Sequence, residues 1–130
     1  MKVAEQRLRD YPNYEKEIKY RKWDLEHSEP DVNASIRAQH KNTNPQEALV
    51  IAWENDPYIK NRLFWKKCVE ETLEALEDTQ RQIVMEYYFE NVYGYRDLGK
   101  KYFMSASSIY RICRQACEIL SEKLGERLPS

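Results

Sequence analysis

The chain has 130 residues and is nearly neutral, with 21 lysines and arginines against 22 aspartates and glutamates, a formal net charge of −1. Only 3 glycines and 5 prolines, together with a charged fraction of 33%, are typical of a protein built from long helices, and we predict an all-α fold. The longest apolar run, residues 48–53, is too short to cross a bilayer, and three cysteines cannot all pair, so we expect a protein of a reducing cytoplasm.

The first third of the chain predicts two helices and a loop. Residues 1–9 have a weak helical periodicity, which residues 10–13 interrupt because Pro12 fixes its own φ and disfavours a helical residue before it. A stronger helix runs from Asn13 to about residue 26, with charges of alternating sign on its solvent face. Residues 27–43 lack periodicity and contain turn residues, so we predict a long loop there.

The middle of the chain predicts two consecutive helices with clear start signals. Asn44 can cap a helix with Pro45 in its first turn, and residues 48–53 are apolar enough to make that helix mostly buried. Asp56, followed by Pro57, ends or kinks this helix and caps the next, which runs for about twenty residues or about 30 Å. The buried stripe of this second helix is expected to comprise Ile59, Leu63, Val69, Leu73 and Leu76.

A further helix is predicted over residues 80–90, with Asp78 or Thr79 as its cap, and residues 91–94 form a turn after it. Its inward side chains are expected to be Ile83, Val84, Tyr87 and Tyr88. We divide the chain into an N-terminal helical region, residues 1–56, with a possible role in oligomerisation, and a C-terminal domain, residues 57–130.

Residues 94–120 predict a helix-turn-helix, in which a longer helix lies across a short one. Gly99 is small where the two backbones come closest, and Ser105 is a candidate cap of the second helix. Phe103 occupies a turn position that glycine often holds, so it needs either an alternative turn or a left-handed conformation. The side chains expected to pack between the two helices are Leu98, Tyr102, Met104, Ile109 and Ile112.

The outer face of the second helix is polar and basic. A helix with such a face can enter the major groove of DNA, where Arg111 or Arg114 could form a bidentate contact with guanine. Side chains of the preceding short helix would hold phosphates. The spacing alone also allows an ordinary pair of packed helices. The expected DNA-binding residues are Tyr95, Arg96, Lys100, Ser105, Ser107, Ser108, Tyr110, Arg111 and Arg114.

The net charge of −1 argues mildly against a nucleic-acid-binding protein, because such domains are usually basic. The distribution of charge matters more than the sum. An acidic block at residues 70–78 lies between clusters of cations, and a dipolar molecule of this kind can dock on phosphates with one face. The cations near the motif are Lys60, Arg62, Lys66, Lys67, Arg96, Lys100, Lys101, Arg111 and Arg114.

The sequence contains no pattern typical of catalysis. It has no glycine-rich phosphate loop, no Gly-x-Ser-x-Gly elbow and no His-Glu-x-x-His. Cys113 and Cys117 are one helical turn apart, as two zinc ligands can be, but no second Cys/His pair completes a structural site. We therefore predict a protein that is not an enzyme, with no cofactor and no metal.

Three segments of the chain resemble the RinA-type phage transcriptional activators and their relatives, the ArpU-like late regulators. Their order and separation match that family over nearly the whole chain, except in the long loop, where Asn33–Ile36 stands in place of an Asn-Ile-Gly-Gly-like patch. Residues 76–120 also resemble DNA-binding region 4 of sigma factors. The three segments are Asp10–Tyr14, Glu86–Phe89 and Leu120–Glu126, and the sigma-like ones are Gln82–Val84, Tyr95–Gly99 and Ser105–Ile109.

The resemblance implies an N-terminal helical region packed on a C-terminal helix-turn-helix like that of sigma region 4. It also implies a phage-encoded activator of late or packaging genes, which binds double-stranded promoter DNA sequence-specifically. Because one recognition helix rarely gives enough affinity, we expect a homodimer or larger homo-oligomer, and host RNA polymerase is a further candidate partner. The expected subunit interface is the aromatic N-terminal half, with Tyr11, Tyr14, Tyr20, Trp23 and Trp53.

Two alternatives remain open. A packaging protein similar to a terminase small subunit would also combine a helix-turn-helix with an oligomerising region, but it would form a ring and lack promoter activity. A protein-binding module would use the same helices to contact RNA polymerase or another regulator, which the weak net charge allows.

Overall fold

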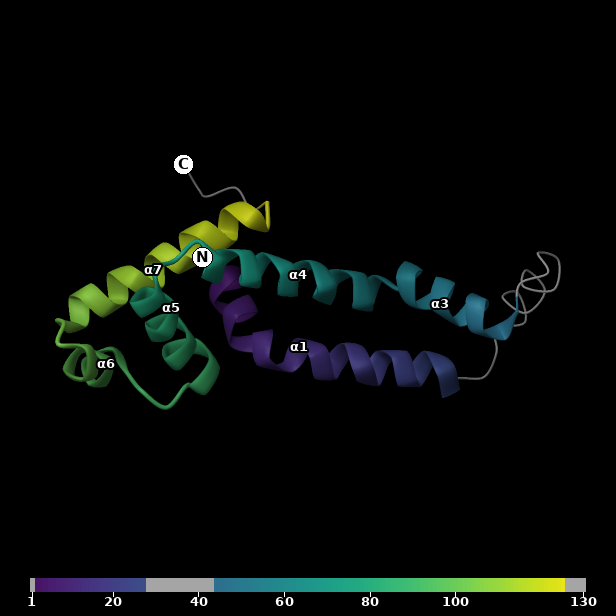
Figure 1. Cartoon of the computed structure of the whole chain (residues 1–130), viewed down its shortest axis with the longest axis horizontal. Helices are drawn as coiled ribbons and strands as arrows, with labels where there is room; N and C mark the ends of the chain where they lie inside the picture. The colour runs from purple at the N-terminus through teal and green to yellow at the C-terminus, as the bar shows by residue number, and fades with distance from the viewer. Residues whose placement is uncertain (1, 28–43, 126–130) are drawn as a thin grey trace. The chain divides into compact units, whose positions relative to one another are not determined.

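The computed structural model describes residues 2–27 and 44–125, and in these ranges the chain is helical with no strand, which confirms the all-α prediction (Figure 1). The helices are α1 (Lys2–His27), α3 (Pro45–Asn55), α4 (Pro57–Glu74), α5 (Asp78–Met85), the π-helical turn η1 (Glu86–Glu90), α6 (Tyr95–Tyr102) and α7 (Ala106–Lys123). No helix in the described ranges is long and apolar enough to cross a membrane. The loop predicted at 27–43 lies outside them apart from His27, which ends α1.

Two compact units divide the chain. The first comprises the chain up to Pro12 together with everything from Trp65 onward, and the second comprises Asn13–Phe64. Helices α1 and α4 each contribute residues to both units. The predicted division into domains at residues 1–56 and 57–130 remains a prediction.

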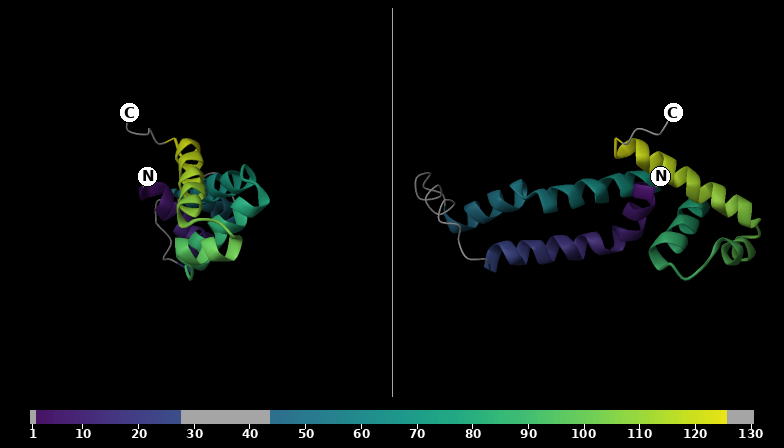
Figure 2. Two further views of the ribbon diagram at one scale, coloured as in Figure 1. Left: turned by 90° about the vertical axis from the view of Figure 1, so that its left-hand side faces the viewer. Right: turned by 180° about the vertical axis from the view of Figure 1, so that it is seen from behind.

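The first unit is built around α7. Helices α5 and α6 both pack on the same side of α7, α6 at its N-terminal end and α5 nearer its middle (Figures 1 and 2). The start of α1 adds to this core through Ala4 and Leu8, and α4 adds Cys68 and Val69, all of which are buried. The remaining buried apolar residues of this core are Leu73, Leu76, Ile83, Val84, Tyr88, Leu98, Ile109, Cys113, Ala116, Cys117 and Leu120.

The second unit has a much smaller interior. Among its described residues the buried apolar side chains are Tyr14, Ile18 and Ile59, and two ion pairs join its helices. Arg21 Nη2 lies 2.9 Å from Asp56 Oδ1, and Arg62 Nε lies 2.6 Å from Glu17 Oε2. The described part of this unit therefore buries few apolar side chains.

The prediction that α3 is mostly buried is wrong. None of its residues is buried, and Ile51 is 50% exposed. The prediction of Leu63 in the buried stripe of α4 is also wrong, because its side chain is 51% exposed, whereas the stripe is otherwise confirmed. Both errors have one cause: periodicity identifies an apolar face, but it does not state whether other parts of the fold cover that face.

The predicted helix break at residues 10–13 is wrong as well, because α1 continues through Pro12. A proline inside a helix costs about 3 kcal/mol, and tertiary contacts of the residue before it offset that cost. Tyr11 stacks on Phe89 with ring centroids 4.9 Å apart, and its hydroxyl donates to Glu70 Oε1 at 3.2 Å. Packing against η1 and α4 thus holds the chain helical where the local signal disfavours it.

Two of the three helix caps predicted between residues 44 and 79 are confirmed. Asn44 Oδ1 accepts a hydrogen bond from the Glu47 amide at 2.7 Å, and Asp56 Oδ2 accepts one from the Ile59 amide at 3.1 Å. The third is wrong by one residue, because Glu77 caps α5 in a capping box with Gln80. The predicted helix over 80–90 is α at its start and widens into the π-helical turn η1 from Glu86.

Candidate nucleic-acid interface

A tight turn joins α6 to α7, and Gly99 makes it possible. The Met104 amide donates to the Gly99 carbonyl at 2.8 Å, which folds the chain back over the end of α6. A Cβ at position 99 would lie 2.6 Å from the Met104 carbonyl oxygen, closer than real Cβ contacts come. The prediction that Gly99 marks the closest approach of the two backbones is therefore confirmed.

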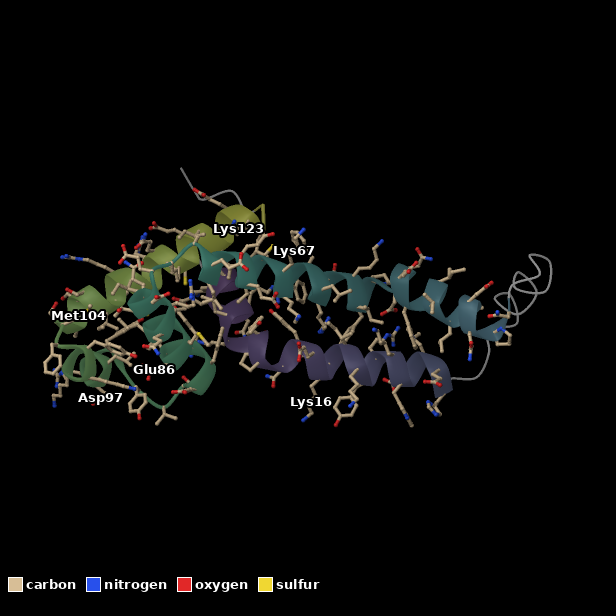
Figure 3. All side chains as sticks on the ribbon, in the orientation of Figure 1. Lys16, Lys67, Glu86, Asp97, Met104 and Lys123 are labelled. Atoms are coloured by element: carbon tan, nitrogen blue, oxygen red, sulfur yellow. The ribbon has the colours of Figure 1, made fainter. Side chains whose placement is uncertain are left out.

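Phe103 adopts the left-handed conformation, one of the two possibilities that the sequence left open, with φ 57° and ψ 43°. Such a conformation costs a non-glycine residue roughly 1–2 kcal/mol, and the Phe103 side chain recovers nothing by packing because it is 96% exposed. Met104 was predicted to pack between the helices, which is wrong, because its side chain is 37% exposed at the turn (Figure 3). The side chains of both residues are therefore exposed at the turn. Leu98 of α6 and Ile109 of α7 are the fully buried side chains of the predicted set.

Ser105 begins α7, as predicted. Its Oγ accepts a hydrogen bond from the Ser108 amide at 3.1 Å and lies 2.9 Å from the Ser108 hydroxyl. Both serines were predicted to contact DNA, and the structure places them together in the cap. Ser107, between them, has an exposed side chain with no hydrogen bond to any described residue.

Helix α7 has two distinct faces. The inward face buries Ile109, Cys113, Ala116, Cys117 and Leu120 against the core of the first unit. The opposite face exposes four of the predicted DNA-binding side chains, which recur along the helix at steps of one, three and four residues. They are Ser107, Tyr110, Arg111 and Arg114.

The two arginines of this face differ in how they are held. Arg114 Nη1 donates to Tyr110 Oη at 3.2 Å, and Arg114 Nε lies 3.4 Å from Glu118 Oε1 one turn further on. The hydrogen bond with Tyr110, reinforced by Glu118, raises the pKa of Arg114. Arg111 has no ion-pair or hydrogen-bond partner within residues 2–27 and 44–125, so its guanidinium is available to a ligand.

A shallow open hollow of about 450 Å³ lies where α6 meets the start of α7, and its lining residues are Tyr95, Ala106, Ser107, Tyr110 and Arg111. Two tyrosine rings shape it. The Tyr95 and Tyr110 rings meet edge to face with centroids 5.6 Å apart, and Tyr87 stacks on the other side of Tyr95 at 4.6 Å. Burial, together with the contact with Tyr87, raises the pKa of Tyr95, so its hydroxyl keeps its proton at neutral pH.

Helix α6 also carries exposed cations. The exposed Arg96 and Lys100 have no acidic partner in the part of the chain that the structure describes. Lys101 differs, because its Nζ forms an ion pair with Glu86 of η1, which also accepts a hydrogen bond from the Tyr102 hydroxyl. Burial would raise the pKa of Glu86, but the hydrogen bonds from Lys101 and Tyr102 outweigh it and lower that pKa.

No group of three or more histidine, cysteine or acidic side chains gathers at metal-binding distance among the described residues. Cys113 and Cys117 lie on the inward face of α7, where burial raises the pKa of Cys113 to about 12 and also raises that of Cys117. The Cys117 sulfur lies 3.3 Å from the Tyr88 hydroxyl. These thiols act as small buried side chains in the core.

The sequence analysis missed three residues that shape this surface. Ala106 was passed over as a small residue, although its i,i+4 spacing to Tyr110 placed it on the outer face. Tyr87 was expected only to face the core. It is half-buried, and its ring stacks on that of Tyr95. Glu86 belongs to a segment that carries the family resemblance, but its contacts could not be predicted, because its partners are 15 and 16 residues away on another helix.

The chain belongs to the family described as "Protein of unknown function (DUF722)", whose model matches residues 2–122. No curated protein and no solved structure matches the chain.

Proposed function

We propose that this member of the DUF722 family is a phage-encoded transcriptional regulator, which binds double-stranded promoter DNA sequence-specifically with α6 and α7 as a helix-turn-helix. The observation that carries the proposal is the outer face of α7. One side of this helix is buried in the core, while Ser107, Tyr110, Arg111 and Arg114 are all exposed on the other. The major groove of B-DNA is wide enough to admit one α-helix, and hydroxyl and guanidinium groups are the donors that contact base edges there.

Arg111 is the best-placed residue for base recognition. It is exposed and unpaired among the described residues, and it lies in the second turn of α7, near the N-terminal end from which recognition helices contact bases. A guanidinium can donate two parallel hydrogen bonds to O6 and N7 of guanine, worth about 1–3 kcal/mol of discrimination. Arg114 is bonded to Tyr110 and Glu118, so it must give up these contacts before it can bind a base.

Phosphate contacts come from α6 in this proposal. Arg96 and Lys100 are exposed cations without an acidic partner in the described ranges, and the Tyr95 hydroxyl stays protonated and can donate to a phosphate oxygen. Such contacts fix the position of a protein on the duplex without selecting its sequence. The net charge of −1 is compatible with this arrangement, because the acidic residues 70–78 lie outside α6 and α7.

We also propose that the protein acts as a homodimer, joined through the second unit. In the part of that unit that the structure describes, three apolar residues are buried, while Tyr20, Trp23, Val50 and Ile51 are exposed. Tyr14 was expected at the interface, but it is buried within its own unit and is not available. A second copy covering this surface would bury these exposed side chains and would place two recognition helices on paired half-sites. From the resemblance to late regulators we also propose that the promoters bound are those of late or packaging genes, and that host RNA polymerase is a further partner.

The test of this function is selection of full-length protein on a pool of random-sequence duplexes at moderate salt, followed by a promoter-reporter assay with the enriched sequence. We expect enrichment of a defined motif and a change in reporter expression that depends on it. Failure to bind any duplex at low salt would contradict the proposal and favour a protein-binding module. Binding without any effect on a promoter would favour a packaging protein.

A further inference from the structure

The hollow at the start of α7 has a lining that suggests a particular chemical group. Ala106 contributes a methyl group, and Tyr95 and Tyr110 contribute ring surfaces from two different helices. The other two lining residues are Ser107 and Arg111, and no acidic residue lines it. The hollow is therefore a mostly apolar recess on an otherwise polar and basic face.

One apolar group stands on the major-groove edge of the bases of unmodified DNA, the C5-methyl of thymine. The other three bases present only hydrogen-bond donors and acceptors there. Apolar side chains such as alanine and phenylalanine contact this methyl group in known protein–DNA interfaces. A recess formed by an alanine methyl and two aromatic rings offers the same kind of contact on three sides.

We propose that this hollow receives the C5-methyl group of a thymine, within about two base pairs of the guanine that Arg111 contacts. The inference rests on the proposed function and specifies its base preference. The distance in base pairs follows from the geometry of α7. Ala106 lies four residues before Tyr110, and Ser107 lies four residues before Arg111, and four residues rise about 6 Å along the helix axis. Bases along one DNA strand are about 3.4 Å apart, so one turn of helix spans about two base pairs.

The hollow is shaped before any ligand binds. Tyr87 stacks on Tyr95 with ring planes 11° apart, and Tyr95 in turn holds the edge-to-face contact with Tyr110. The Tyr110 hydroxyl accepts a hydrogen bond from Arg114, which fixes the other end of the ring. Because both aromatic walls are held by neighbours, a methyl group gains contact without paying to order them.

The experiment compares thymine with deoxyuridine, which differs only by the C5-methyl group, at each thymine of the selected binding sequence. Full-length protein is titrated against each substituted duplex. We expect a loss of about fourfold in affinity at one thymine per half-site, the effect of removing one buried methyl group. For Tyr110→Ala, the ratio of the affinities for the thymine and deoxyuridine duplexes should fall to about one. Tyr110→Phe keeps the ring and should retain the wild-type ratio.

Each result of this comparison decides the matter. Specific binding in which no thymine is sensitive to deoxyuridine overturns the inference and leaves the proposed function standing. The same holds if Tyr110→Ala keeps the full thymine preference while still binding DNA. If the wild-type protein binds no duplex at all, the proposed function fails, and the thymine preference fails with it.

Discussion

The backbone of Gly99 on α6 lies so close to the Met104 carbonyl that a Cβ at position 99 would stand 2.6 Å from that oxygen. The Met104 amide closes the same contact with a 2.8 Å hydrogen bond to the Gly99 carbonyl. Because the neighbour is backbone rather than a flexible side chain, it cannot give way without moving the start of α7. This one glycine therefore sets how α6 and α7 cross, and with it the position of every side chain on the candidate interface.

Gly99→Ala is expected to destabilise the protein by about 1–3 kcal/mol, the usual cost of forcing an extra carbon into a well-packed site. Urea unfolding measures this change. Gly94→Ala is the matched control, because a Cβ there meets nothing within 4 Å and φ is −85°, so its stability should stay near that of the wild type. Equal midpoints for Gly99→Ala and Gly94→Ala would show that the close approach is not required.

Phe103→Gly is expected to stabilise the protein by about 1 kcal/mol, because glycine adopts the left-handed conformation without the cost that a side chain imposes. The lost phenylalanine contributes no packing, since its side chain is 96% exposed. Phe103→Ala is the control, because it removes the ring and keeps the strain, and it should leave stability nearly unchanged. Thermal unfolding of the wild type, Phe103→Gly and Phe103→Ala gives the comparison. If the glycine variant melts at a lower temperature than the alanine variant, the conformation of Phe103 is not strained.

The ion pair of Glu86 with Lys101 predicts part of the acid sensitivity of the first unit. The pKa of Glu86 lies below its ordinary value of about 4.5 in the folded protein, so ionised Glu86 stabilises the fold above that pH. This contribution is lost as the pH falls through the lowered pKa of the folded state. Unfolding free energies between pH 7 and pH 3 should fall less steeply for Glu86→Gln than for the wild type.

The control for the acid series is Glu74→Gln, at an exposed position without a hydrogen bond to any other residue that the structure describes. It should follow the wild-type curve. If Glu86→Gln also follows the wild-type curve, the contact from η1 to Lys101 and Tyr102 contributes nothing to stability.

The dimer proposal places the exposed apolar residues of α3 in a contact with a second copy. Ile51→Glu should raise the dissociation constant of the dimer at least about tenfold, because burying an unpaired carboxylate is costly. Gln46→Glu adds the same charge at an exposed position of the same helix and should leave association unchanged. Light scattering over a concentration series measures both, and a wild-type protein that remains monomeric at high concentration would remove this part of the account.

The sequence could predict those features of the fold that depend on neighbours in the chain. Asn44, Asp56 and Ser105 cap helices as expected, since a cap is a contact between residues two or three positions apart. The left-handed Phe103 could be foreseen for the same reason. The outer face of α7 followed from helical periodicity, which also fixed its buried side.

Features that depend on distant contacts could not be predicted. The continuation of α1 through Pro12 requires Phe89 and Glu70, more than fifty residues away. The exposure of Ile51 and Leu63 depends on whether other parts of the fold cover them, and an apolar sequence pattern cannot predict this. The hollow at Ala106 was missed because one of its walls, Tyr95, belongs to the preceding helix and only the tight turn brings it close.

The central claim is that α7 recognises base sequence while α6 holds phosphates, and one titration tests it most directly. Wild type, Arg111→Ala and Lys100→Ala are titrated against the selected duplex and a scrambled duplex at several salt concentrations. Arg111→Ala should lose the preference for the selected duplex, a change of about 1–3 kcal/mol, whereas Lys100→Ala should weaken binding to both duplexes equally and reduce the salt slope by about one. If both variants keep wild-type affinity and preference, the account of this interface is wrong.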